Sequence, residues 1–205
     1  YVRVVEDGAF TEEWGQIIND LYTPACLERL PANLPVKSGI TTVYGTTGTY
    51  AEQYAKENGL EFLDMAKTPF VDVPENEWYF PYVHDVYWLG LMNGTTKSTF
   101  GPNAAATRAQ TWTMLARIAG QDTRRSSTWY EVGQKWAMNL GITDGTNPMG
   151  SLTREQLAAM LYRYVGSPAV NGTLTFTDSA NVSAWARNAM IWAVQNGILD
   201  GVGGN

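Results

Sequence analysis

The chain has 205 residues, a formal net charge of −6 and an apolar fraction of 44%. The acidic balance disfavours nucleic acid as a partner, because neutralising phosphates requires clustered Lys and Arg. The sequence also lacks the run of roughly 20 apolar residues that a membrane-spanning helix needs, so we expect no membrane insertion. Eight Trp and eleven Tyr indicate a large aromatic core or a surface for flat ligands such as sugars.

Residues with catalytic or metal-binding chemistry are few. Cys26 is the single cysteine, which excludes an internal disulfide and a multi-cysteine metal site. His84 is the single histidine, and its spacing suggests no catalytic partner, so we expect a surface or packed side chain. The sequence therefore predicts no catalytic residue, no metal and no cofactor.

Residues 1–66 have patterns that differ from the rest of the chain. Short apolar alternations bounded by Gly, Pro and Thr predict strands. Thr49, followed three residues later by Glu52 and then by Gly59, predicts a capped helix with a glycine stop. The predicted strands cover residues 2–5, 26–31, 40–44 and 60–63, and the predicted helix covers residues 49–59.

Two motifs in this segment resemble the surface-protein type of leucine-rich repeat. The first is Val5-Glu6-Asp7-Gly8-Ala9-Phe10, together with Cys26-Leu27 and Leu30-Pro31. The second covers residues 44–59 and is similar to the unit that closes such arrays. The resemblance implies that residues 1–66 end a leucine-rich-repeat region, with a helix that covers the last open edge of the solenoid.

A repeated pattern begins at residue 70 and continues to the end of the sequence. Each repeat has a Trp, apolar residues at helical spacing and two glycines after the predicted helix. The step from the Trp to the second glycine is 16 residues in all three repeats, from Trp78 to Gly94, from Trp129 to Gly145 and from Trp185 to Gly201.

A second predicted helix follows in the first two repeats and begins with the same motif. Residues 106–110 read Ala-Thr-Arg-Ala-Gln, and residues 152–156 read Leu-Thr-Arg-Glu-Gln. A Thr followed three residues later by Gln forms a capping box, in which both side chains bond backbone N–H or neighbouring groups at the helix start. The third repeat stops at Asn205 before any such motif, so we expect a truncated repeat.

The repeats resemble the S-layer homology (SLH) module. The match rests on the Trp and Gly positions, the two Thr-Arg motifs, Phe70-Val71-Asp72-Val73, Phe100, Pro102 and Phe176-Thr177-Asp178. The second repeat departs from it, with Ser126-Ser127-Thr128 where the Phe-x-Asp entry belongs. The two resemblances imply an α+β chain with a leucine-rich-repeat-like β and cap segment at 1–66. Mainly helical SLH repeats at about 70–120, 125–166 and 175–205 would then fill residues 67–205 as a pseudo-threefold bundle with an incomplete third repeat.

The SLH resemblance implies a secreted protein at the cell wall or surface of a bacterium, anchored non-covalently to a secondary wall polysaccharide that often carries a pyruvyl ketal. Arg offers a bidentate donor fork to the pyruvyl carboxylate, and a helix N-terminus favours an anion. A Trp can stack on a sugar ring, an Asp can accept from hydroxyls, and a Gly allows close approach. The implied carbohydrate-binding residues are Arg108, Arg154, Asp72, Asp178, Trp78, Trp129, Trp185, Gly94 and Gly145.

Each of these residue types also has an ordinary structural use. The arginines can be solvated or can pair with a nearby carboxylate, and the aspartates can cap turns. Equivalent tryptophans in repeats usually belong to the core, which we favour here, and glycines after helices usually end them. Because only the first repeat keeps its Phe-x-Asp entry and full-length turn, we expect Arg108 to matter more than Arg154, and Arg108→Ala to weaken binding without disturbing the fold.

Two other functions compete with anchoring. A purely structural surface-lattice protein would self-associate, and the incomplete third repeat offers an apolar face for this. A glycan-processing enzyme would need paired carboxylates, and none recurs beside the Arg motif. We therefore predict a binding module rather than an enzyme.

Overall fold

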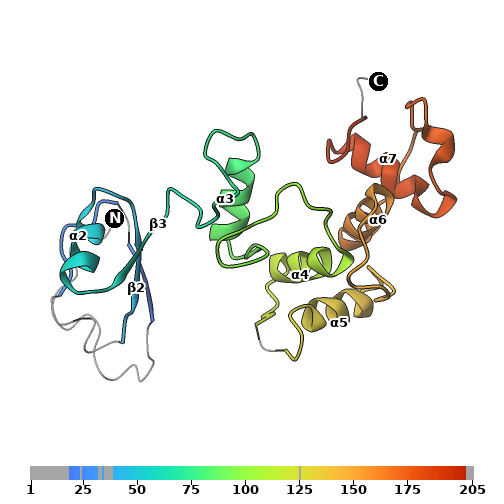
Figure 1. Ribbon diagram of the computed structural model, residues 1–205. Helices are drawn as coiled ribbons and strands as arrows, with labels where there is room; N and C mark the ends of the chain where they lie inside the picture. Colours follow the sequence, from blue (N-terminus) through green and yellow to red (C-terminus); the bar gives the residue numbers. More distant parts are fainter. Residues whose placement is uncertain (1–18, 24, 32–33, 35–38, 125, 202–205) are drawn as a thin grey trace. The chain divides into compact units, whose positions relative to one another are not determined.

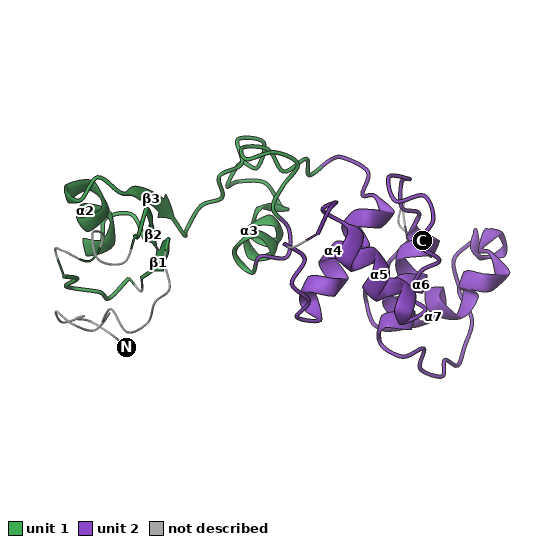
Figure 2. Ribbon diagram, turned by 90° about the horizontal axis from the view of Figure 1, so that it is seen from below, with its two compact units in different colours: residues 1–89, 93–102 green, residues 90–92, 103–205 purple. Residues whose placement is uncertain are grey.

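The computed structural model describes residues 19–23, 25–31, 34, 39–124 and 126–201. The chain divides into two compact units, residues 1–89 with 93–102 and residues 90–92 with 103–205 (Figure 2). It combines a small parallel sheet with helices, which agrees with the predicted mixed α+β class (Figure 1). The predicted strand at residues 2–5 and the motif at residues 5–10 lie outside the described residues.

The sheet of the first unit has three short parallel strands in the order β1-β2-β3, namely β1 (Asp20–Tyr22), β2 (Thr42–Gly45) and β3 (Glu61–Asp64). Asp20 pairs with Thr42 and Thr42 pairs with Glu61, so one residue position recurs after 22 and then 19 residues. The predictions for β2 and β3 are confirmed. The strand predicted at residues 26–31 is wrong, because Cys26 lies in a turn and the paired strand lies earlier, at β1.

Helix α2 (Tyr50–Glu57) covers this sheet as predicted. Ala51, Tyr54 and Ala55 are buried against Val43 and the leucines of the preceding loop, and the Tyr54 hydroxyl donates to the backbone carbonyl of Pro31 at 2.8 Å. The predicted capping box does not form at its N-cap, Thr49. The Thr49 hydroxyl donates to the Thr46 carbonyl, while Glu52 accepts from the Gly48 N–H.

The first repeat begins with a separate aromatic cluster in the same unit. Phe70, Val73 and Val83 are buried, and Val83 belongs to helix α3 (Phe80–Trp88). The Phe100 ring packs on Phe70 with centroids 5.3 Å apart. Asp72 holds this arrangement, because its two carboxylate oxygens accept the backbone N–H groups of Phe100 and Gly101, both at 2.8 Å.

The second unit consists mainly of helices, α4 (Arg108–Ile118), α5 (Glu131–Asn139), α6 (Arg154–Tyr164) and α7 (Arg187–Gln195), with two 3-10 turns, η2 (Ser179–Asn181) and η3 (Ala184–Ala186). Helix α4 packs on α5, and α6 packs on α7. The first pair buries Trp112, Leu115 and Ala137, and the second pair meets through alanines such as Ala158 and Ala189.

Both predicted capping boxes are confirmed. Thr107 and Gln110 form one at α4, and Thr153 and Gln156 form the other at α6. The first of these helix starts does not offer free N–H groups to an anion, however. The backbone N–H of Arg108 donates to the Gly150 carbonyl at 3.1 Å, and that of Ala109 donates to the Pro148 carbonyl at 2.9 Å. The expectation of an anion site at the first turn of α4 is therefore wrong, because the loop before α6 satisfies those donors.

No helix among the described residues is both long and apolar enough to cross a bilayer. Across the same residues, no group of three or more His, Cys, Asp or Glu side chains is arranged to hold a metal ion.

Candidate functional site

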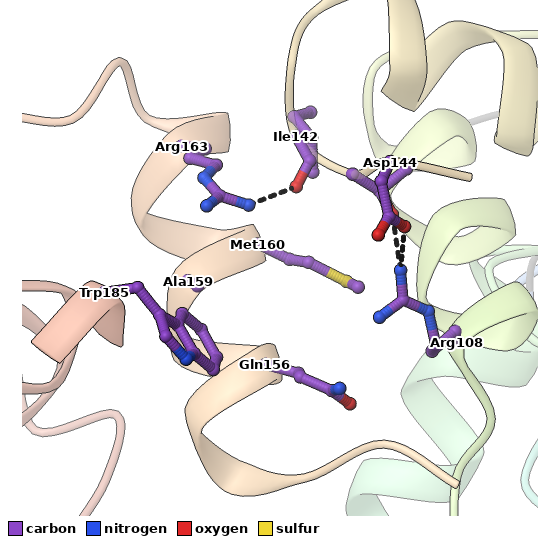
Figure 3. Close-up of a pocket in the computed structure, with 9 residues that line it drawn as sticks. Arg108, Ile142, Asp144, Gln156, Ala159, Met160, Arg163 and Trp185 are labelled. Atoms are coloured by element: carbon purple, nitrogen blue, oxygen red, sulfur yellow. Dashed lines mark hydrogen bonds and ion pairs between the residues drawn. The ribbon is translucent and has the colours of Figure 1, made fainter. Parts of the chain in front are cut away.

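A cavity of about 310 Å³ lies in the second unit where elements from all three repeats meet (Figure 3). Helix α4 supplies an arginine, the loop after α5 supplies one wall, helix α6 supplies the opposite wall, and η3 adds a tryptophan. The lining residues are Arg108, Ile142, Thr143, Asp144, Gln156, Ala159, Met160, Arg163 and Trp185.

Arg108 is the first residue of α4, and its side chain reaches the loop of the second repeat. Its Nη2 donates to the Thr143 hydroxyl at 3.1 Å and forms an ion pair with the Asp144 carboxylate. The guanidinium carbon lies 5.5 Å from the ring centroid of Trp112, and the side chain is 11% exposed. Of the two structural alternatives for this residue, pairing with a carboxylate is the one that occurs.

Asp144 is the anionic partner in this wall. Its carboxylate accepts the backbone N–H of Thr146 at 3.0 Å. This hydrogen bond, aided by the charge of Arg108, holds the pKa of Asp144 below its ordinary value. Because the Asp144 side chain is 64% exposed, its carboxylate faces solvent as well as Arg108.

Two buried donors beside this ion pair have no hydrogen-bond acceptor among the described residues. They are Nε of Arg108 and Nε1 of Trp112. A buried donor without an acceptor costs about 1–3 kcal/mol. The neighbourhood of Arg108 therefore has unused hydrogen-bonding capacity in addition to the group that binds Asp144.

Arg163 forms the opposite wall and was missed by the sequence reasoning. Its Nη1 donates to the Ile142 carbonyl at 3.1 Å. The equivalent Arg117 of the first repeat donates to the Leu91 carbonyl at 2.8 Å. Each of these arginines lies nine residues after the arginine of its Thr-Arg motif, so the signal was present in the repeat. Their shared role is to hold the glycine turn of their own repeat.

The second Thr-Arg motif reaches the next repeat in a parallel way. Arg154 Nη2 donates to the backbone carbonyl of Asp200, which occupies the place that Asp144 has in the preceding repeat. Arg154 is exposed, and it lines a second cavity of about 370 Å³ with Asp178, Phe176 and Asp200. Each Arg therefore contacts the Gly-x-x-Asp-Gly turn that follows, once through a carboxylate and once through a carbonyl.

The three repeat tryptophans are exposed, so the expectation that they pack in the core is wrong. Trp78 is 78% exposed, Trp129 is 49% exposed and Trp185 is 56% exposed. Each precedes its helix rather than lying on it, and its ring therefore avoids the buried helical face. Trp185 lines the first cavity, while Trp78 and Trp129 contact neighbouring tyrosine rings.

The remaining predicted residues have structural surroundings. Asp72 binds backbone N–H groups of its own repeat, as described above. Gly94 has φ +79°, and a Cβ there would lie 2.5 Å from the Phe70 ring, so the close approach it allows is internal. Gly145 also has positive φ, and its carbonyl accepts from the Gln134 side chain at 2.7 Å.

Comparison with known proteins identifies the repeats. Residues 69–111 and 175–205 match the S-layer homology domain family. An endoglucanase of Bacillus sp. (strain KSM-635) is 31% identical over 65% of this chain and 16% of its own length. An amylopullulanase of Thermoanaerobacterium thermosulfurigenes is 28% identical over 75% of this chain and 9% of its own length. S-layer protein sap of Bacillus anthracis is 28% identical over 65% of this chain and 18% of its own length.

The chain thus spans less than a fifth of each of these relatives. Residues 112–174 fall between the two matched ranges, and they include the second repeat, whose entry motif departs from the pattern. The family matches and the surface-protein relatives indicate a location at the cell surface or cell wall. They support a surface-anchoring role for the repeats.

Proposed function

We propose that this chain anchors a larger protein to a bacterial cell wall by binding a secondary wall polysaccharide in the cavity between Arg108 and Trp185. The observation that carries the proposal is the combination of guanidinium groups and an exposed indole around one cavity of about 310 Å³. Saccharides that carry a carboxylate present one anionic group and one apolar ring face, and the two parts of this cavity fit them.

The charged part of the cavity has two arginines and one aspartate. Arg108 retains a buried Nε without an acceptor among the described residues, and Arg163 uses Nη1 for the Ile142 carbonyl. A ligand carboxylate, such as the one of a pyruvyl ketal, would be favoured between two guanidinium groups. Asp144 would accept sugar hydroxyls, and it would also compete with the ligand for Arg108.

The apolar part of the cavity is Trp185 above α6. The Trp185 ring is 56% exposed and lies beside Ala159 in the cavity wall (Figure 3). A small residue at 159 leaves room for a sugar ring against the indole face. The predicted sugar-stacking role thus fits Trp185 better than Trp78 or Trp129, which lie outside this cavity.

The relatives favour binding over catalysis. The same segment type recurs in proteins named endoglucanase, amylopullulanase and S-layer protein, and it covers a small part of each. Proteins with such different names share a module more readily for attachment than for one reaction. A self-assembling lattice protein is the second candidate, and the relatives named S-layer proteins favour it.

The domain organisation that we propose begins with a leucine-rich-repeat region up to about residue 66. The parallel strand register with steps of 22 and 19 residues supports it, because such repeats are 20–29 residues long. Residues 67–205 would contain the SLH repeats as a pseudo-threefold bundle. Helix α2 would then close the solenoid.

The anchoring proposal is tested by co-sedimentation with purified wall sacculi before and after chemical removal of the secondary polymer. We expect the chain to sediment with intact sacculi and to stay in solution with stripped sacculi. Equal binding to both would contradict the proposal. Concentration-dependent assembly in the absence of any wall material would favour the lattice function instead.

A further inference from the structure

The second cavity, beside Arg154, has features that do not fit a saccharide. Its floor is formed by apolar side chains of the third repeat, and its volume is about 370 Å³. The apolar residues in its lining are Leu174, Phe176, Val182, Met190, Val194 and Leu199. A cavity whose floor is mostly aliphatic binds a hydrophobic side chain more readily than a hydroxyl-rich ring.

The first repeat shows which side chain fills the equivalent place. Counting from the repeat tryptophans, Met190 corresponds to Val83 and Val194 to Tyr87, and each repeat begins with Phe-x-Asp. In the first repeat Val83 and Tyr87 pack in one cluster with Phe70 and Phe100. The Phe100 ring, which arrives from the turn after the helix, lies 5.3 Å from Phe70.

The polar contacts follow the same correspondence. Asp72 accepts the backbone N–H groups of Phe100 and Gly101, both at 2.8 Å. Asp178 is the equivalent residue, and it lines the second cavity with an exposed side chain. In the part of the chain that the structure describes, the Asp178 carboxylate accepts no backbone N–H from such a turn. Phe176 is half-buried where Phe70 is 4% exposed.

We propose that the second cavity binds a peptide segment with a Phe-Gly-Pro turn, in the manner in which residues 100–102 complete the first repeat. The phenylalanine enters the apolar floor between Phe176 and Met190. The two backbone N–H groups at the turn donate to the two carboxylate oxygens of Asp178. The cavity is therefore a protein-docking site that is separate from the saccharide cavity at Arg108, and it can exist whether or not the anchoring proposal is correct.

The test uses the full chain, labelled with ¹⁵N, and a synthetic peptide that copies residues 97–104. Backbone amide shifts of α7 and of residues 176–182 are followed by NMR as peptide is added up to millimolar concentration. We expect saturable shifts at these amides. The copy of the peptide with Phe100→Ala should cause none, because it lacks the ring that fills the floor.

The matched protein variants are Asp178→Asn and Asp20→Asn, two exposed aspartates of which only the first lines the cavity. Asp178→Asn should weaken peptide binding about tenfold, since it replaces a charged acceptor of two hydrogen bonds. Asp20→Asn should leave it unchanged. Superimposable thermal melts of both variants and the parent chain establish that folding is not the cause.

Absence of saturable shifts with the parent peptide would overturn the proposal. It would also be overturned by equal binding of the Phe100→Ala peptide or by equal binding to Asp178→Asn, because either result shows contact outside the proposed site. Shifts of the same amides with released wall polysaccharide but not with peptide would assign the cavity to a saccharide instead.

Discussion

The two junctions between consecutive repeats use the same motif with different results. The first junction comprises α4, α5 and the Arg108–Asp144 ion pair, and the second comprises α6, α7 and the contact from Arg154 to the Asp200 carbonyl. Arg108 is 11% exposed and stacks over Trp112, whereas Arg154 is exposed. Both helices begin with the same capping box.

This difference separates two tasks that the motif combines. The Thr and Gln start the helix, which is a local task and is done equally at both junctions. The Arg selects a partner in the following repeat, and that partner depends on the loop it meets. At the first junction the Arg is part of the packing, while at the second it remains available to solvent and to ligands.

The largest expected effect is on stability and distinguishes the two arginines. Arg108→Ala removes an ion pair and the packing of the guanidinium on Trp112, so it should lower the free energy of unfolding by about 2 kcal/mol. Arg154→Ala, on an exposed side chain, should change it by less than about 0.5 kcal/mol. Urea unfolding of both variants measures this. Equal losses would mean that the junctions are energetically alike.

This prediction revises the expectation that Arg108→Ala leaves the fold intact. A side chain that is 11% exposed and paired with a carboxylate cannot be removed without loss of contacts. Arg108→Lys, which keeps the charge but not the fork, is therefore the better variant for binding studies. The expectation that Arg108 contributes more to binding than Arg154 stays a prediction.

The capping boxes should respond alike. Thr107→Ala and Thr153→Ala each remove a side-chain acceptor for an N–H at the helix start, and each should cost about 1 kcal/mol. Thr→Ser at the same positions keeps the acceptor and serves as the control. The same unfolding titrations apply. A cost at only one site would show that local helix starts also differ between the junctions.

The smallest expected effect is a pH dependence at the first junction. The pKa of Asp144 is lowered by the Thr146 N–H and then by Arg108, so its folded-state value lies below the ordinary 3.8. Its stabilising contribution is therefore present above about pH 4 and is lost as the pH falls through the folded-state pKa. Because the side chain is mostly exposed, the contribution should be under about 1 kcal/mol.

Thermal melts of the parent chain and of Asp144→Asn between pH 5 and about pH 2 measure this contribution. The parent should lose more stability than the variant over that interval. A constant difference between the two across the range would show that ionisation of Asp144 does not stabilise the junction.

Local features were predictable from the sequence, and long-range partners were not. The two capping boxes, helix α2 and strands β2 and β3 follow from patterns within a few residues. Strand β1 was missed because Asp20-Leu21-Tyr22 is too short to alternate, and its pairing with β2 determines it. The internal satisfaction of the α4 start by Pro148 and Gly150 also depends on the fold.

The candidate site shows the same division. The sequence indicated Arg108 and Trp185 as binding residues, and the structure brings both to one cavity. It could not indicate that Asp144 pairs with Arg108, because the two are 36 residues apart. Exposure of the tryptophans was also not predictable, since a repeated aromatic residue fits a core and a surface equally well. Arg163 could have been found from its recurrence at Arg117.

The most direct test of the cavity as the anchoring site compares two exposed tryptophans in calorimetric titrations with released wall polysaccharide. Trp185→Ala removes the indole that lines the cavity, and Trp129→Ala removes one of similar exposure outside it. We predict that Trp185→Ala weakens binding at least about tenfold, the effect of losing one well-packed aromatic contact, while Trp129→Ala binds as the parent does. Unchanged binding by Trp185→Ala, or equal weakening by both variants, would contradict the assignment.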